Sequence, residues 1–477
     1  MDVQRYDLVV IGSGPAGEKG AAQAAYFGKS VALVEKEAHY GGAAANTGTL
    51  PSKTLRETAL FLSGFRNRDL SGLNLTLKQQ VTISDFMVHE QHVTRDERIR
   101  IINNLARHHV RTYSGAGAFV DPHTIAIRSP EGEETRIQGE RILIAVGSTP
   151  VRPPLFPFQD HRVWDSDSIL NLRDLPKSML VVGGGVIGCE YACMFAILGV
   201  KVTVVEQRDR ILGSVDSEVA AALQAQMESI GVHFVFKDSV LSVEAGRGID
   251  VRLKSGLSLS TGAILVSAGR NGNTRTLGLE NVGVMTNDRG LIKVNPQYQT
   301  NVPHVYAAGD VIGSPGLAST AMEQARVAMV DAFDLKYKSV VAHVLPYGIY
   351  TIPECSQAGE TEDALKAKGI PYVSGKASYS TNARGKIIGD DKGFLKLLFH
   401  AEDMKLLGVH VIGEQATELV HVGLTALLMN QGADLFIATC YNYPTLTELY
   451  KYATYDALGK RAKLQGIPER IAGLATP

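Results

Sequence analysis

Two glycine-rich segments of this chain have the residue types and spacing that hold phosphate groups. The first is Gly12-Ser13-Gly14-Pro15-Ala16-Gly17 with Glu35 after it, and the second is Gly183-Gly184-Gly185-Val186-Ile187-Gly188 with Glu206 after it. In such a loop the first glycine permits a tight turn, the second lets a pyrophosphate approach the backbone, and the third lets a helix pack closely. The acid, 23 positions beyond the first glycine in both copies, accepts hydrogen bonds from a ribose hydroxyl. Two dinucleotide sites in one chain indicate an electron relay.

Each loop must lie between a buried strand and a helix to do this chemistry. Residues 6–11 are rich in Val, Leu and Ile, which is typical of a buried strand, and residues 29–35 form the next strand after an Ala-rich helix that ends near Phe27. Residues 179–206 repeat this β-α-β unit. The N-terminus of each helix then offers unpaired N–H groups and a positive dipole end to the phosphates.

Composition narrows the class of protein. The chain has 477 residues, 45% of them apolar and 20% charged, and its net charge is −1. This length predicts about three domains, and the lack of a basic excess argues against a nucleic-acid partner. We find no apolar run long enough for a membrane span and no signal-peptide pattern at the N-terminus. Four cysteines are too few for a disulfide scaffold, so we expect a cytoplasmic protein.

Two of the cysteines, Cys189 and Cys193, share a helix face because they are four residues apart. They are either a redox or metal pair or two small buried residues, and the second interpretation is favoured because free cysteines often pack as small hydrophobic residues. Glu418 and His421 form a single Glu-x-x-His pair, whereas a di-iron site needs two such pairs and two further carboxylates. No metal site is predicted.

Further motifs extend the pattern over nearly the whole chain. They are Gly41-Gly42, Thr49-Leu50-Pro51-Ser52-Lys53, Ala145-Val146-Gly147-Ser148 and Gly309-Asp310. Together with the two glycine-rich loops, they resemble the two-dinucleotide flavoprotein reductases, a family that includes dihydrolipoamide dehydrogenase, glutathione reductase and mercuric reductase. The resemblance implies that the first site holds FAD and the second a nicotinamide dinucleotide, either NAD(H) or NADP(H).

The same resemblance implies an α/β fold with two Rossmann-like dinucleotide-binding domains, for FAD and NAD, and a C-terminal α+β dimerisation domain. Residues 1–150 would form the first part of the FAD-binding domain, 151–271 the NAD(P)-binding domain, 272–340 the second part of the FAD-binding domain, and 341–477 the interface domain. A run of prolines from Pro150 to Pro157 supports the first boundary. The chain would be a homodimer in which each C-terminal domain closes the partner's flavin site.

Individual residues take expected roles from this match. Glu35 would bind the FAD ribose, Asp310 the ribitol chain, and Ala318 would lie near the flavin pyrimidine. Asp310 alone could be a helix cap, a common role of Asp, but its place near the carboxyl end of a strand favours the cofactor. The other candidate cofactor-binding residues outside the two loops are Gly42, Thr49, Ala145, Gly147 and Gly269, with Ala116 and Gly117 beside the adenine.

Lys53 and Glu190 match the two members of an ion pair beside the flavin and are the candidate catalytic residues. A cation at that place would stabilise the negative charge that flavin reduction adds. The alternative is a surface lysine and a helical glutamate with no relation to each other.

The redox disulfide of the family is missing. Aligned on Pro51-Ser52-Lys53, its two cysteines fall at Ala44 and Thr49, and neither residue can form a thiolate. Tyr443 stands where the dithiol enzymes carry a histidine base, and a tyrosine with its ordinary pKa of about 10 is a poor base at neutral pH. We therefore expect no dithiol exchange, a packing or gating role for Tyr443, and a structural role for Glu448.

This combination resembles the flavin-dependent soluble pyridine nucleotide transhydrogenases, over residues 165–170, 186–192, 348–354 and 442–445. The predicted reaction transfers hydride between NAD(H) and NADP(H) by a ping-pong mechanism through the flavin, without a redox-active disulfide. One alternative is an NAD(P)H dehydrogenase that reduces a quinone or another small acceptor. Another is a non-catalytic flavoprotein that binds nucleotides and acts through a partner.

Nucleotide preference depends on the end of the second β-α-β unit. Glu206 favours an unphosphorylated ribose and repels a 2′-phosphate. Arg208 and Arg210 could offset this repulsion, because arginine suits phosphate recognition, or they could form an ordinary solvated charge cluster. We expect NAD(H) to bind, and the sequence leaves NADP(H) binding open.

Overall fold

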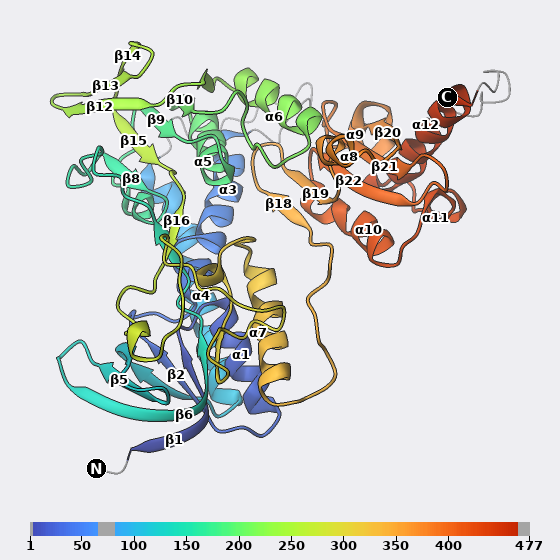
Figure 1. Ribbon diagram of the computed structural model, residues 1–477. Coiled ribbons are helices and arrows are strands. Elements are labelled where there is room, and N and C mark those ends of the chain that lie inside the picture. Colours follow the sequence, from blue (N-terminus) through green and yellow to red (C-terminus); the bar gives the residue numbers. More distant parts are fainter. Residues whose placement is uncertain (1–2, 65–81, 466–477) are drawn as a thin grey trace.

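The computed structural model describes residues 3–64 and 82–465 of the chain. Figure 1 shows three groups of elements: a blue, cyan and gold group that includes the N-terminal strands, a green group, and an orange to red group formed by the C-terminal part of the chain. The predicted α/β class is confirmed. Among the helices of these residues, none is long and apolar enough to span a membrane.

The first sheet carries the first glycine-rich loop. Its strands are β1 (Gln4–Ile11), β2 (Val31–Glu35), β3 (Arg111–Ser114), β4 (Ala116–Phe119), β5 (Thr124–Arg128), β6 (Glu134–Ile144) and β17 (Val305–Ala307). They run in the order β3-β2-β1-β6-β5-β4, and β17 pairs with the end of β6. The neighbours β3, β2, β1 and β6 pair in parallel, and so do β6 and β17. The pairs β6–β5 and β5–β4 are antiparallel.

Both faces of β1 are covered, which explains its unbroken apolar sequence. Leu8 and Val10 pack with the helices α1 (Pro15–Tyr26), α4 (Ile83–Arg107) and α7 (Ala318–Ala332), and Figure 1 shows α7 beside α1. Val9 and Ile11 pack on the opposite face, in a core shared with β5 and with residues 277–311.

The second sheet repeats the arrangement of the first. Its strands β8 (Val163–Asp165), β9 (Ser178–Val182), β10 (Lys201–Glu206), β11 (His233–Phe236) and β15 (Ala263–Val266) are all parallel, in the order β11-β10-β9-β15-β8. The helices are α5 (Val186–Ile197) and α6 (Ser217–Ser229). In both sheets the strand before the loop therefore lies next to the strand that ends in the acid. A separate antiparallel sheet contains β12 (Val240–Ala245), β13 (Ile249–Leu253) and β14 (Ser258–Thr261).

Two short elements connect the first two groups. The strands β7 (Ser148–Pro150) and β16 (Arg270–Gly272) pair where the chain enters and leaves the second group. Helix α3 (Thr49–Ser63) follows the short α2 (Gly42–Asn46) and packs against α5, since Leu55 and Ala59 share a core with Ala192. The domain boundaries at residues 150, 271 and 340 stay predictions.

The C-terminal part is an antiparallel sheet with helices. Its strands β18 (Tyr347–Ile349), β19 (Cys355–Gly359), β20 (Tyr372–Ser378), β21 (Phe394–His400) and β22 (Leu406–Ile412) run in the order β18-β19-β22-β21-β20. The helices are α8 (Glu362–Lys368), α9 (Ala383–Ile387), α10 (Ala416–Leu428), α11 (Ala433–Ala438) and α12 (Leu449–Leu464). Figure 1 places α6 of the green group beside this sheet.

Candidate functional site

The first glycine-rich loop is a tight turn between β1 and α1 whose glycines have different surroundings. Gly12 has φ +101°, and an added Cβ would overlap the carbonyl oxygen of Ala145. A Cβ on Gly17 would overlap the carbonyl oxygen of Gly12, so the helix packs directly on the turn. A Cβ on Gly14 would make one ordinary contact, 3.8 Å from Gly42 Cα, and Gly14 begins α1 without a side-chain cap. An uncapped helix N-terminus beside an uncrowded glycine fits a pyrophosphate.

The second loop repeats this geometry between β9 and α5. Gly183 has φ +105°, and an added Cβ would lie 2.7 Å from the carbonyl oxygen of Ser267. A Cβ on Gly188 would overlap the carbonyl oxygen of Gly183, whereas one on Gly185 would meet no atom within 4 Å. Gly185 begins α5 without a side-chain cap. The second loop therefore offers the same opening for phosphate groups.

The two acids are held by the second residue of each loop. Ser13 donates its N–H and its hydroxyl to Glu35 Oε2, at 2.9 and 2.5 Å. Gly184 donates its N–H to Glu206 Oε2 at 2.6 Å, and Arg208 donates its N–H to Oε1 at 2.9 Å. A carboxylate has about four acceptor sites. Both acids therefore keep capacity for a ribose hydroxyl.

Arg208 and Arg210 converge on one glycine after β10. Arg208 Nη1 would lie 2.7 Å from a Cβ added to Gly213, and Arg210 Nη2 donates to the Gly213 carbonyl at 3.3 Å. Arg210 also forms an ion pair with Asp363 of α8, with 3.1 Å between Nη2 and Oδ2. No sequence pattern pointed to Asp363, which is separated from Arg210 by 153 positions.

Lys53 and Glu190 meet between α3 and α5. Lys53 Nζ lies 2.6 Å from Glu190 Oε2, and the side chains are 27% and 6% exposed. The N–H of Tyr350 donates to Glu190 Oε1 at 2.9 Å, and Lys53 Nζ lies 5.0 Å from the centre of the Tyr350 ring. The glutamate therefore has two partners and holds the ammonium group in one place. Sequence reasoning missed Tyr350 as a partner, because a backbone donor has no sequence signature.

The positions of the missing disulfide hold small side chains in α2 and at the start of α3. Ala44 lies in α2 and is half-buried, and Thr49 is the exposed first residue of α3. Three of the free cysteines, Cys189, Cys193 and Cys355, are buried elsewhere. Burial raises the pKa of the Cys193 thiol to about 12 and also raises that of the other two. The prediction of small buried residues at 189 and 193 is confirmed.

The candidate residues on the flavin side lie around β6, β17 and α7. Asp310 begins the single turn η3 (Asp310–Ile312), and its Oδ2 accepts the Ser148 hydroxyl at 3.0 Å. The N-cap residues of η3 and α7 are Gly309 and Leu317, so Asp310 is not a helix cap. Ala318 begins α7, which has no side-chain cap. Ala145 and Gly147 follow β6, and Ala116 and Gly117 lie in β4, with Gly269 before β16.

Tyr443 and Glu448 lie near the C-terminal end of the described chain. Tyr443 is 76% exposed, so it does not pack within the described part of one protomer. Glu448 ends the turn η5 (Leu446–Glu448), directly before α12. Their roles stay predictions.

Comparisons with known proteins agree with this architecture. Residues 6–325 match the family model described as pyridine nucleotide-disulphide oxidoreductase, and residues 345–454 match the dimerisation domain of the same family. The chain belongs to the pyridine nucleotide-disulphide oxidoreductase family. The family resemblance drawn from the motifs is thus confirmed, and the orange and red part of Figure 1 contains the family's dimerisation domain.

Full-length relatives and solved structures are similar to the chain. A soluble pyridine nucleotide transhydrogenase of Mycobacterium tuberculosis is 46% identical, over 97% of this chain and 99% of the relative. That of Pseudomonas putida is 40% identical, over 96% of this chain and 100% of the relative. The structure of LpdA from Mycobacterium tuberculosis has a TM-score of 0.87 at 26% identity, covering 95% of this chain and 99% of its own. The HOCl-induced flavoprotein disulfide reductase RclA of Escherichia coli has a TM-score of 0.85 at 25% identity, covering 94% and 99%.

Proposed function

We propose that this chain is an FAD-dependent transhydrogenase that transfers hydride between NAD(H) and NADP(H) without a redox disulfide. The observation that carries the proposal is the Lys53–Glu190 ion pair, which joins the helix after the missing disulfide to the helix of the second nucleotide loop. With Ala44 and Thr49 at the thiol positions, the chain offers no dithiol there as an electron acceptor. The names of the full-length relatives support the same reaction.

The residues of the first loop fit FAD. The space at Gly14 and the uncapped N-terminus of α1 suit its pyrophosphate, and Glu35 retains acceptor capacity for its ribose. Asp310, which follows β17 and accepts a hydrogen bond from the Ser148 hydroxyl, would meet the ribitol chain. When bound, FAD supplies two-electron redox chemistry. The second loop fits a nicotinamide dinucleotide by the same criteria at Gly185, α5 and Glu206.

The protein's own contribution is to orient charges. Glu190 is buried and bound by the Tyr350 N–H, so it fixes the Lys53 ammonium group without needing to move. A fixed cation stabilises developing negative charge better than water that must reorient. Binding both nucleotides in preset sites also removes the entropic cost of their encounter. Arg208, which lies beside Glu206, would receive the 2′-phosphate of NADP(H).

The assembly that we propose is a cytoplasmic homodimer in which each C-terminal domain closes the partner's flavin site. The dimerisation domain over residues 345–454 supports it. Tyr443, exposed in one protomer, would then pack or gate at the interface.

A second candidate function is reduction of a quinone or another small acceptor by NAD(P)H. It is favoured by the exposure of Thr49 and the small side chain of Ala44, which leave room where the disulfide would stand. Both functions share the oxidation of a reduced nicotinamide nucleotide.

Stopped-flow mixing separates the functions. The holoenzyme is first reduced with NADH or with NADPH, and the bleaching of its flavin absorbance is recorded. The reduced enzyme is then mixed with thio-NAD⁺, thio-NADP⁺ or a soluble quinone. We expect bleaching with both reductants and recovery with the nicotinamide analogues. Recovery with the quinone alone would reject the transhydrogenase, and lack of bleaching with either reductant would support the non-catalytic flavoprotein.

A further inference from the structure

Arg210 is held by a residue from the C-terminal part of the chain. Its Nη2 lies 3.1 Å from Asp363 Oδ2 in α8, and the same nitrogen donates to the Gly213 carbonyl at 3.3 Å. The two side chains are 37% and 46% exposed. Such a partly solvated ion pair is weak, so a stronger anion can replace the carboxylate.

The segment that carries Arg210 also contacts the second glycine-rich loop. The segment after β10 folds back on the second loop, since the N–H of Leu212 donates to the Gly184 carbonyl at 2.9 Å. Gly184 in turn donates to Glu206. The Arg208 side chain also lies against Gly213, and within residues 3–64 and 82–465 no ion pair joins it to a carboxylate. Two guanidinium groups therefore contact one glycine in this segment, and of the two only Arg210 is paired with a carboxylate within the described residues.

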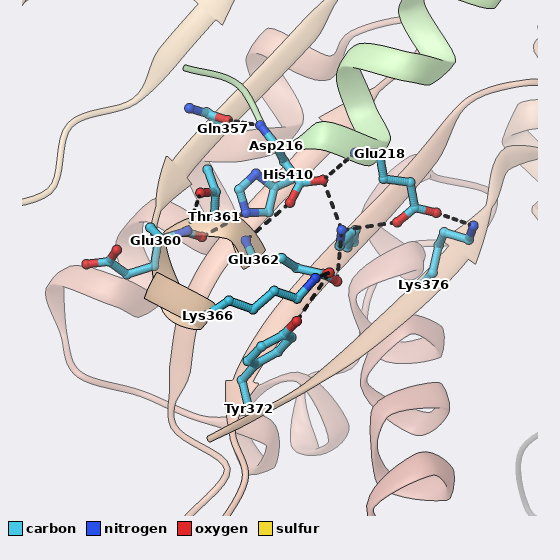
Figure 2. A network of polar contacts seen from close by, with 12 residues as sticks. Asp216, Glu218, Gln357, Glu360, Thr361, Glu362, Lys366, Tyr372, Lys376 and His410 are labelled. Carbon is cyan, nitrogen blue, oxygen red and sulfur yellow. Dashed lines mark hydrogen bonds and ion pairs between the residues drawn. The ribbon is translucent and has the colours of Figure 1, made fainter. Parts of the chain in front are cut away.

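Glu362, the residue before Asp363, belongs to a network of charges with Asp216 and Glu218 (Figure 2). Lys396 of β21 is 2% exposed and contacts Asp216, Glu218 and Glu362, at 2.9, 3.1 and 3.0 Å. Asp216 caps α6, at the end of the segment that carries the two arginines, and Glu362 precedes Asp363 in α8. The network thus fixes α8 against the segment between β10 and α6, which carries Arg208 and Arg210 and is called here the arginine segment.

A second contact holds the same segment. The N–H of Asp216 donates to Gln357 Oε1 at 3.2 Å, and Gln357 Nε2 donates to the Ser214 carbonyl at 3.1 Å. Gln357 belongs to β19 of the C-terminal sheet. The C-terminal part therefore fixes the position of the arginine segment. Asp363 neutralises one of the two positive charges in that segment.

We propose that Asp363 is a specificity-determining residue of the nicotinamide nucleotide site, because it neutralises Arg210 and so weakens binding of a ribose 2′-phosphate. The inference rests on the proposed function for the identity of the nucleotides. Asp363 holds the Arg210 guanidinium group in an ion pair and cancels its positive charge. With Arg208 unpaired and Arg210 paired, the site favours neither nucleotide strongly, which suits an enzyme that must bind and release both.

Calorimetric titration of the holoenzyme with two redox-inert fragments tests the proposal. Adenosine 2′,5′-bisphosphate carries the 2′-phosphate, and 5′-AMP lacks it. We expect Asp363→Asn to tighten binding of the bisphosphate about two- to fivefold, the range of a partly exposed ion pair, and to leave 5′-AMP binding unchanged. In the double variant Arg210→Ala/Asp363→Asn the gain should vanish, because it depends on Arg210.

Glu360→Gln is the matched control. It removes one negative charge just before α8, but Glu360 pairs with Lys368 instead of Arg210. An equal gain in Glu360→Gln, a gain that persists in the double variant, or an unchanged ratio of the two fragment affinities in Asp363→Asn would each overturn the proposal. Thermal unfolding of each variant checks its fold, and Asp363→Ser provides a second replacement. Because the fragments carry no nicotinamide, the result is independent of whether the holoenzyme catalyses transhydrogenation.

Discussion

Lys53 and Glu190, 137 positions apart in the sequence, lie 2.6 Å apart between Nζ and Oε2. Their contact joins α3 of the first group of elements to α5 of the second. The other oxygen of Glu190, Oε1, accepts the N–H of Tyr350 from the C-terminal part. All three groups of elements in the fold therefore meet at this carboxylate. A buried charge needs such partners to offset its lost hydration.

Replacing Lys53 by Met should slow the bleaching of the flavin by NADH about tenfold or more, because a preset cation is lost from the site. Stopped-flow absorbance at saturating NADH measures the rate. Lys405→Met, which removes an exposed lysine beside Asp403, serves as the control. An unchanged rate in Lys53→Met would remove this residue from the active site.

Replacing Arg208 by Ala should weaken NADP⁺ binding about tenfold or more, since a charge-assisted contact to phosphate is lost. NAD⁺ binding should not change, because Arg208 touches Glu206 only through its backbone N–H. Titration calorimetry with both nucleotides measures the difference. Arg252→Ala, at an exposed position of β13, is the control. Equal weakening of the two nucleotides would contradict a role in phosphate recognition.

Two glycines of the second loop should respond differently to Ala. In Gly185→Ala the new Cβ meets no protein atom within 4 Å, so stability should not change, but NAD⁺ affinity should fall about tenfold or more because the methyl group fills the phosphate space. In Gly188→Ala the Cβ overlaps the Gly183 carbonyl, which should cost about 1–3 kcal/mol of stability. Thermal unfolding and nucleotide titration of both variants separate the effects. Similar losses of stability would show that the loop has no open side.

Lys396→Met should destabilise the fold by about 3–5 kcal/mol, because it leaves the fully buried Asp216 without its cation. Chemical denaturation measures the free energy of unfolding. Lys460→Met is the control: Lys460 is 48% exposed and pairs with Asp456 along one helix, a contact worth at most about 0.5 kcal/mol. If both variants lose the same stability, the buried network does not support the fold.

His410 should make the fold less stable below neutral pH. Burial lowers its pKa below the ordinary 6.5, so between 6.5 and the lower folded value the unfolded chain binds more protons than the folded one. The free energy of unfolding then decreases as the pH falls through that window. The groups that face His410 include Asp216, Lys396 and Glu362.

Asp216 and Glu362 affect the stability of the fold at a lower pH than His410 does. Burial alone would raise the pKa of Asp216 and Glu362, but neighbouring positive charges, Lys396 among them, outweigh it and hold both values below normal. Their stabilisation is present above the unfolded values and is lost only as the pH falls through the lower folded values. Urea denaturation at pH 7.5 and 5.5 isolates the histidine. We expect His410→Gln, which can still donate to the Glu360 carbonyl, to lose less stability than the wild type over this range, and equal losses would exclude His410.

The sequence alone was sufficient for the two nucleotide loops and for the family. Both loops depend on local backbone geometry: Gly12 and Gly183 adopt positive φ, and Gly17 and Gly188 pack where no Cβ fits. Such requirements act within one β-α-β unit, so they are visible in the order of residues. The absence of thiols at Ala44 and Thr49 is a matter of composition at aligned positions. The C-terminal dimerisation domain was recognised only through the resemblance.

Only the tertiary structure decided which charges meet. The Lys53–Glu190 pair was expected from the match, but its third partner, Tyr350, was not. Asp363 lies 153 positions from Arg210, and Lys396 lies 180 positions from Asp216. These contacts exist because α3 packs on α5 and because α8 and β21 pack on the segment before α6. Packing between elements distant in the chain produces no periodic pattern in the sequence. The partner of a charged side chain is therefore known only once the positions of the elements are known.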